Sequence, residues 1–288
     1  MSLGGGNTFD HIPLPGGLRL HVAMAGPVDG PLVVLLHGFP EFWYGWRHQI
    51  AALAEAGLRV VAPDQRGYNL SDKPAGIAAY RLDTLAADVA SLAAALGRER
   101  FAVVGHDWGG VVSWQVAARF PERVTRAAIL NAPHPATLRP YARRHPSQLA
   151  KSWYVAFFQL PALPELALRA DGCWVLRRML RRTSRPDTFS DADFAHYREA
   201  WAQPGALTAS LNWYRALRLG AGGPPAGRVR VPVRVIWGDR DAFLDRGLAE
   251  AGAALCDDCE VFHLPGATHW VQHEQPGEVN RLLLDFLA

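Results

Sequence analysis

The stretch Val103-Val104-Gly105-His106-Asp107-Trp108-Gly109-Gly110 joins an apolar run to a helical pattern through a turn with glycine on both sides. Residues 101–104 predict a buried strand, and residues 110–119 predict a helix. Asp107 then stands at the apex of a tight, strained turn, where flanking glycines allow the backbone to approach closely. The form Gly-x-nucleophile-x-Gly is typical of an elbow above a parallel sheet, with aspartate here in the place of an esterase's serine.

The aspartate changes the chemistry that such an elbow can perform. A carboxylate can attack an electrophilic sp3 carbon and form an alkyl ester, which water must then cleave. Taken alone, Asp107 could instead cap the following helix. The rest of the chain favours the nucleophile.

Composition excludes several classes of partner. The chain has 288 residues, of which 49% are hydrophobic and 20% charged, with a net charge of +3. That charge is small and dispersed, so we expect no nucleic-acid partner. No apolar run reaches the ~20 residues that cross a bilayer, so we expect no membrane partner. Residues 1–15 are polar and Gly-rich without the apolar core of a secretory signal, which predicts a cytoplasmic protein.

Cysteines and glycine loops give no sign of a metal or a cofactor. Cys173 stands alone, and Cys256 and Cys259 form a single C-x-x-C. One such pair is weak support for zinc, and its place before a strand does not suit a redox motif, so we interpret these thiols as structural. No phosphate-binding Gly loop is present. We therefore expect no cofactor and no metal.

Short apolar runs alternate with longer helical patterns, as in repeated βα units. The predicted strands are residues 18–23, 32–36, 59–62, 101–104, 127–130, 233–237 and 260–264. The predicted helices are residues 42–56, 82–96, 110–119, 246–254 and 276–287. Nearly continuous apolar strands indicate a mostly parallel central sheet covered by helices on both faces.

The alternation stops after Pro133 and resumes near Val231. The intervening region is rich in Trp, Tyr, Arg and Pro and looks helical. It is too long for an ordinary connection between two elements. Asn131-Ala132-Pro133-His134-Pro135 and Gly220-Ala221-Gly222-Gly223-Pro224-Pro225 are plausible hinges. We predict a core domain of residues 1–134 and 226–288, with a helical cap inserted at residues 135–225.

An ester on Asp107 requires a base that activates water. His269, in Gly266-Ala267-Thr268-His269-Trp270 after the last predicted strand, can reach the elbow from the same sheet edge. His263 and His273 are the alternatives.

The base in turn needs an acid that orients it. The loop Trp237-Gly238-Asp239-Arg240-Asp241 offers two aspartates. We favour Asp241, which sits in the loop proper, and keep Asp239 as the alternative. The order nucleophile, acid, histidine is that of the α/β-hydrolases.

Donors for an oxyanion are expected from His37-Gly38-Phe39-Pro40, which follows the strand at 32–36. Gly38 permits the tight turn, and the backbone N–H groups of Phe39 and Trp108 can point at the oxyanion. Pro40 is a candidate for a cis bond. His37 is interpreted as a structural residue.

Together these segments resemble the soluble, bacterial α/β-hydrolase-fold epoxide hydrolases. The similarity includes Asp64-Gln65-Arg66-Gly67-Tyr68-Asn69-Leu70-Ser71-Asp72-Lys73-Pro74, with Asn69 where many relatives carry glycine, and it covers essentially the whole chain. In that family two cap tyrosines hydrogen-bond the epoxide oxygen. The matching segments are Tyr154-Val155-Ala156-Phe157-Phe158-Gln159 and Asn212-Trp213-Tyr214-Arg215, which implies Tyr154 and Tyr214.

Two other functions compete with this resemblance. Haloalkane and fluoroacetate dehalogenases share the aspartate, but one group carries Asn where Phe39 stands, and the other carries Arg where Trp108 stands and a His-Trp pair at Tyr154-Val155. A non-catalytic α/β-hydrolase scaffold that binds a hydrophobic ligand is the third possibility, although every expected catalytic residue is present.

The resemblance implies that Asp107 opens an epoxide to a vicinal diol through an alkyl-enzyme ester. Water activated by His269 and Asp241 then cleaves that ester. An apolar pocket for a small apolar epoxide is expected from aromatic side chains, namely Phe39, Trp108, Phe157, Phe158, Phe243 and Trp270. We expect a monomer or homodimer.

Overall fold

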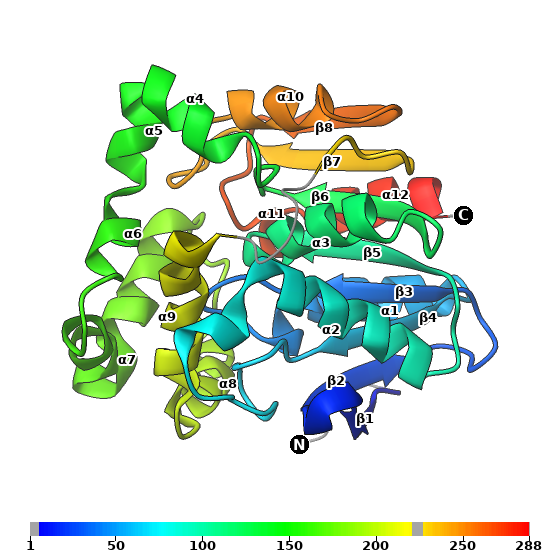
Figure 1. Cartoon of the computed structure of the whole chain (residues 1–288), viewed down its shortest axis with the longest axis horizontal. Helices are drawn as coiled ribbons and strands as arrows, with labels where there is room; N and C mark the ends of the chain where they lie inside the picture. The colour runs from blue at the N-terminus through cyan, green and yellow to red at the C-terminus, as the bar shows by residue number, and fades with distance from the viewer. Residues whose placement is uncertain (1–5, 221–226, 288) are drawn as a thin grey trace.

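A computed structural model describes residues 6–220 and 227–287. Its eight strands form one sheet in the order β1-β2-β4-β3-β5-β6-β7-β8 (Figure 1). Their bounds are β1 Thr8–Pro13, β2 Arg19–Ala25, β3 Leu32–Leu36, β4 Arg59–Pro63, β5 Phe101–His106, β6 Val124–Leu130, β7 Val233–Gly238 and β8 Cys259–Leu264. β2 runs antiparallel to β1 and β4, whereas the neighbours from β4 to β8 are parallel. This arrangement confirms the predicted α/β-hydrolase fold.

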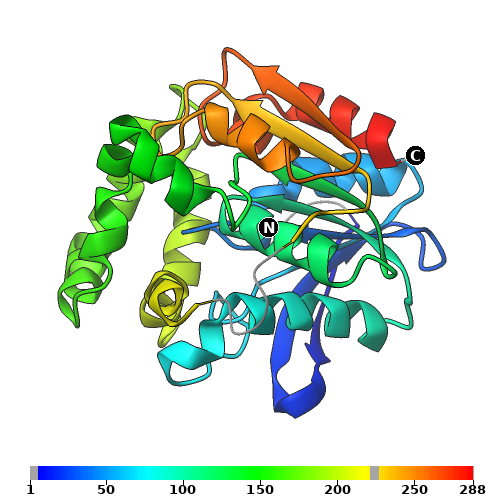
Figure 2. The ribbon, with the colours of Figure 1, turned by 45° about the horizontal axis from the view of Figure 1, so that its top comes forward.

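Helices cover both faces of the sheet (Figure 2). On one face α1 (Arg47–Glu55) packs against α12 (Pro276–Leu287), and on the other α2 (Leu82–Ala95) packs against α3 (Trp108–Arg119). α10 (Gly247–Ala253) lies beside α3, because Gly252 leaves room for the Trp114 ring.

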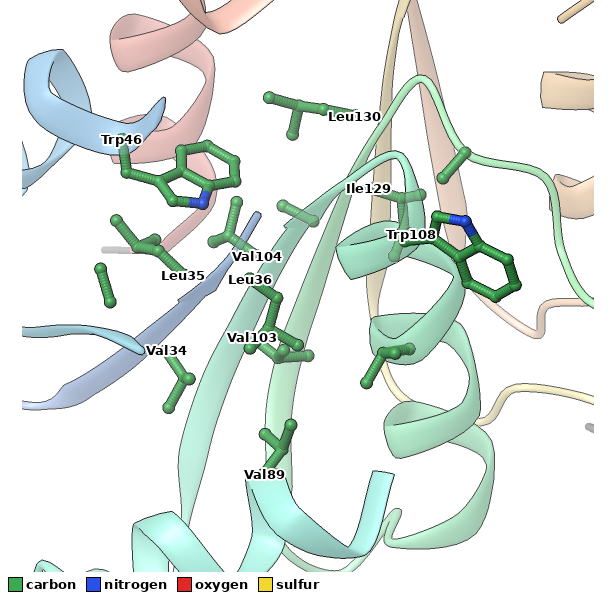
Figure 3. Close-up of a cluster of buried hydrophobic side chains, with 14 of the residues drawn as sticks. Val34, Leu35, Leu36, Trp46, Val89, Val103, Val104, Trp108, Ile129 and Leu130 are labelled. Atoms are coloured by element: carbon green, nitrogen blue, oxygen red, sulfur yellow. The ribbon is translucent and has the colours of Figure 1, made fainter. Parts of the chain in front are cut away.

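The core is densest around the middle strands. Every residue of β3 and β5 is buried, since helices cover these strands on both sides. Figure 3 shows aliphatic side chains of β3, β5 and β6 gathered between Trp46 and Val89, which come from opposite faces of the sheet. This packing holds the carboxyl end of β5, where Asp107 follows.

Several element predictions were wrong in detail. β1 was not predicted, because its residues are mostly exposed and give little apolar alternation. The segment predicted as helix 42–56 begins with a 3-10 turn at Trp43–Trp46. β8 was expected to be central but is the edge strand, and only Leu264 of it is buried. β5 extends to His106 and α3 begins at Trp108, so the turn consists of Asp107 alone.

Helices without strands occupy the described part of the chain between β6 and β7. They are α4 Leu138–Arg144, α5 Pro146–Lys151, α6 Trp153–Phe157, α7 Leu163–Thr183, α8 Asp191–Ala202 and α9 Ala206–Ala216. α7 is interrupted by non-helical backbone from Ala170 to Cys173. In Figure 1 these helices lie together at the end of the sheet where β5 meets α3. The expected cap boundary at 225/226, with most of the second hinge, lies outside the described residues.

Among residues 6–220 and 227–287, no helix combines the length and apolar character needed to cross a bilayer.

Candidate active site

Asp107 occupies a strained turn between β5 and α3. Its backbone has φ 51° and ψ −122°, a conformation that non-glycine residues rarely adopt. A Cβ on Gly109 would lie 2.0 Å from the carbonyl oxygen of Leu36, and one on Gly38 would lie 2.4 Å from the Asp107 Cβ. Glycine is therefore required at both positions for the strands to bring this carboxylate to the sheet edge.

His269 lies between two carboxylates. Its Nε2 is 3.4 Å from Asp107 Oδ2, and its Nδ1 is 2.7 Å from Asp241 Oδ2. Asp241 also accepts hydrogen bonds from the Phe243 N–H at 2.7 Å and the Leu244 N–H at 3.0 Å. The structure thus brings together the predicted nucleophile, base and acid.

The competing aspartate and histidines lie elsewhere. Asp239 pairs with His263 at 2.6 Å and with Arg246 at 3.6 Å, so it is engaged away from His269. His273 Nε2 contacts Glu41 Oε1 at 2.7 Å in a buried cluster. The geometry therefore favours Asp241 and His269 over the alternatives.

The electrostatics of His269 favour the charged imidazolium. Burial alone would lower its pKa, but the charge of Asp241 and the hydrogen bonds that His269 donates to Asp107 and Asp241 raise the pKa of His269 to about 10. Burial likewise works against the Asp241 carboxylate, yet the His269 charge and the donated hydrogen bonds hold its pKa below the usual value. The free site is thus an imidazolium held between two carboxylates.

One backbone donor points toward the nucleophile. The Phe39 N–H donates to Asp107 Oδ1 at 2.8 Å, and the Phe39-Pro40 bond is cis, as the sequence suggested. Trp108 is the first residue of α3, so its N–H has no acceptor within the helix. His37 is buried, lies 2.9 Å from the Gly38 carbonyl and accepts from the Gln65 N–H, which fits its predicted structural part.

The two tyrosines implied by the resemblance meet across the cavity from Asp107. Tyr154 lies on α6 and Tyr214 on α9, with their ring centroids 5.9 Å apart. Burial, and then the negative charge of Asp107, raise the pKa of both phenols above the usual value. Each hydroxyl therefore stays protonated and can act as a donor at neutral pH.

A cavity of about 570 Å³ joins these groups. Asp107, His269, Tyr154 and Tyr214 all line it, and its remaining wall is predominantly apolar. Five of the six predicted pocket residues line it, namely Phe39, Phe157, Phe158, Phe243 and Trp270.

The prediction for the Trp108 side chain was wrong. Trp108 points sideways from α3 and packs edge-on against Trp213 at 5.6 Å and Tyr214 at 5.1 Å. It supports a tyrosine instead of facing the cavity. Sequence reasoning also missed the wall contributed by α7, whose Leu168, Leu176 and Met179 line the cavity on both sides of its non-helical stretch.

Two supports of the site were also missed. Asn131 has φ 41°, donates to Asp241 Oδ2 at 2.7 Å and accepts from the Gly238 N–H at 2.8 Å. The sequence pattern predicts only a hinge at this residue. Behind His269, the buried His106 Nε2 lies 2.8 Å from the His269 carbonyl oxygen.

The cysteines lie away from the cavity. Cys256 lies between α10 and β8, Cys259 is the first residue of β8 and Cys173 lies in α7, and all three are free thiols. None of them lines the cavity around Asp107.

Comparisons with known proteins agree with this geometry. A family model described as alpha/beta hydrolase fold matches residues 31–276. AB hydrolase superfamily protein YfhM of Bacillus subtilis is 49% identical over 94% of this chain and 95% of that protein. Epoxide hydrolase 2 of Caenorhabditis elegans is 37% identical over 94% of this chain and 77% of that protein.

A solved structure extends the likeness to three dimensions. The crystal structure of a Bacillus megaterium epoxide hydrolase in complex with an inhibitor superimposes with a TM-score of 0.88 at 31% identity, covering 96% of this chain and 99% of that one. Fold, site geometry and sequence identity therefore agree, and the chain belongs to the α/β-hydrolase-fold family, in the group of its epoxide hydrolases.

Proposed function

We propose that this enzyme hydrolyses small apolar epoxides to vicinal diols through an ester on Asp107. The observation that supports this most strongly is the pair of tyrosines, Tyr154 and Tyr214, that share an apolar cavity with Asp107. Phenols can both hydrogen-bond a strained ring oxygen and give it a proton as it departs. The residue roles below belong to this proposal.

Ring opening is the first step. Tyr154 and Tyr214 donate hydrogen bonds to the epoxide oxygen, while a carboxylate oxygen of Asp107 attacks a ring carbon from the opposite side. The carbon–oxygen bond of the ring breaks as the ester bond forms, and the alkoxide takes a proton from a tyrosine. The bond from the Phe39 N–H holds Asp107 in position for this attack.

Ester formation prepares the second step, because it removes the negative charge of Asp107. The pKa of His269 in the free enzyme is raised partly by that charge and by the hydrogen bond to Asp107. Alkylation therefore lowers the pKa of His269, and the imidazolium can release its proton to the tyrosinate that ring opening leaves. The neutral imidazole can then act as a base. Asp241 remains as its orienting partner.

Hydrolysis completes the cycle. His269 Nε2 takes a proton from water as the hydroxide attacks the ester carbonyl, and the N–H groups of Phe39 and Trp108 stabilise the tetrahedral oxyanion. The acyl–oxygen bond breaks and the departing diol oxygen takes the proton from His269. The carboxylic acid left on Asp107 then passes its proton to His269, which restores the carboxylate and the imidazolium of the free enzyme. No step in this scheme calls for a metal or an organic cofactor.

Halide release is less well supported by the site. A dehalogenase needs donors such as an indole N–H directed at the departing halide. Here the Trp108 ring packs against α9 and does not line the cavity, whereas two phenols, those of Tyr154 and Tyr214, do.

A trapping experiment tests the proposal. The variant His269→Gln should form the ester but fail to cleave it, so after mixing with styrene oxide its intact mass should rise by one substrate. Peptide mapping should place the adduct on Asp107, and the double variant with Asp107→Ala should remain unmodified. Diol formation without an adduct would contradict the mechanism, and faster halide release from a short haloalkane would contradict the substrate class.

The domain bounds, the cellular location and the oligomeric state are further proposals. We propose that residues 135–225 form the cap, that the protein is cytoplasmic, and that it is a monomer or homodimer. Cell fractionation and light scattering of the purified protein would check the last two.

A further inference from the structure

The short cap helix α5 is attached to the loop that carries Asp241. Lys151, the last residue of α5, donates through Nζ to the carbonyl oxygens of Asp241 at 2.9 Å and Leu244 at 3.3 Å. The same Nζ lies 3.0 Å from Asp245 Oδ1. One ammonium group thus holds three acceptors of the loop that follows β7.

Gln148, one turn earlier on α5, holds the same loop at two further points. Its Nε2 donates to the Phe243 carbonyl at 3.0 Å, and its Oε1 accepts from the Asp245 N–H at 2.7 Å. The Gln148 residue is fully buried. A buried amide whose two ends are both used in this way fixes the local position of the backbone.

The other side of this loop holds the carboxylate of Asp241. Asp241 Oδ1 accepts from the backbone N–H groups of Phe243 and Leu244, and Asp241 Oδ2 faces His269. The Phe243–Leu244 peptide links the two sides, because Gln148 binds its carbonyl oxygen and Asp241 accepts from its N–H. Lys151 holds the peptides on either side of this stretch through the carbonyl oxygens of Asp241 and Leu244. A shift of these peptides would turn the carboxylate away from the imidazole.

We infer that Lys151 and Gln148 are positioning residues through which docking of the cap sets the orientation of Asp241. Tyr154 follows Lys151 by three positions in the chain, so one segment of the cap places both the ring-opening phenol and the acid that serves hydrolysis. This inference rests on the proposed function and adds a coupling between its two steps.

The test separates the two half-reactions under single-turnover conditions. In Lys151→Met the loop loses its charged donor, and hydrolysis of the Asp107 ester should slow by about tenfold, the loss expected for one charge-assisted hydrogen bond. Alkylation at saturating styrene oxide should change by less than about threefold, so the ester should accumulate. Saturating substrate is needed because Lys151 also lines the cavity.

Further variants separate positioning from general weakening of the cap. Gln148→Met removes both loop contacts at similar size and should show the same selective loss, while Lys151→Arg retains donors and should restore part of the hydrolysis rate. Tyr44→Phe is the matched control, because it removes a contact between the core and α8, the 2.9 Å bond to Asp193, away from the acid loop. It should leave the ratio of the two rates unchanged.

The outcomes are distinct. Equal slowing of both steps in Lys151→Met and Gln148→Met, or a ratio no different from that of Tyr44→Phe, would overturn the inference. Circular dichroism and the melting temperature check folding of each variant. Failure of the wild type to form an ester would instead refute the proposed function.

Discussion

The charge of His269 should depend on the charge of Asp107, and this can be measured. Asp107→Asn keeps the shape of the side chain but removes the negative charge 3.4 Å from His269 Nε2. At an effective dielectric constant of about 20, two unit charges at that distance attract by about 5 kcal/mol, which corresponds to between three and four pKa units. Solvent around Asp107, whose side chain is 18% exposed, screens part of this attraction. We expect the pKa of His269 to fall by about two units.

The sign follows from which form Asp107 stabilises. Asp107 favours the imidazolium, so the wild-type histidine, with a pKa of about 10, holds its proton through neutral pH. In Asp107→Asn, as in the ester, the proton leaves at lower pH. The rate of hydrolysis of a preformed ester should therefore rise with pH. It should reach its plateau at a pH well below the pKa of His269 in the free enzyme.

The assay is an NMR titration of protein labelled with 15N at histidine. His269→Gln identifies the resonance of His269 among the eleven histidines. An unchanged His269 pKa in Asp107→Asn would refute the electrostatic link between the two steps.

The remaining predictions concern the tyrosines and the acid. Tyr154→Phe and Tyr214→Phe should each slow ring opening by roughly tenfold to a thousandfold, equivalent to ~1.4–4 kcal/mol, and the double variant should abolish alkylation of Asp107 in stopped-flow measurements while the far-ultraviolet spectrum stays unchanged. Near-wild-type ring opening by the double variant would make both tyrosines packing residues. Asp241→Asn should slow ester hydrolysis strongly and Asp239→Asn only mildly in the same single-turnover assay; the reverse ranking would transfer the orienting role to Asp239.

The elbow could be predicted from the sequence because its determinants are local. An apolar run, a residue between glycines and a helical pattern are adjacent in the chain, so the strand, the turn and Asp107 follow from one short segment. The choice between Asp239 and Asp241 depends on where β7 ends, and strand ends are poorly defined by composition. The structure ends β7 at Gly238 and leaves Asp239 beside His263.

Longer-range features could not be predicted in this way. The direction of the Trp108 ring is set by Trp213 and Tyr214, which lie more than a hundred positions along the chain. The cavity wall from α7 and the contacts of Lys151 likewise depend on how the cap helices sit on the core. β1 is held by its pairing with β2, and its own residues show little of the apolar pattern that identifies strands.

The strands on either side of the cap are neighbours in the sheet. β6 ends at Leu130, and β7 pairs with it in parallel from Ala127 opposite Val233, so the chain leaves the sheet and returns to the adjacent position. The chain between β6 and β7 is thus one connection between neighbouring strands, and its length does not alter the pairing of any strand. The inserted helices can therefore change during evolution, and substrate preference with them, while the sheet and the residues at its edge are kept. Under the proposed mechanism, any replacement would still have to supply two phenols and contacts to the loop that carries Asp241, which limits the insertions that selection can accept.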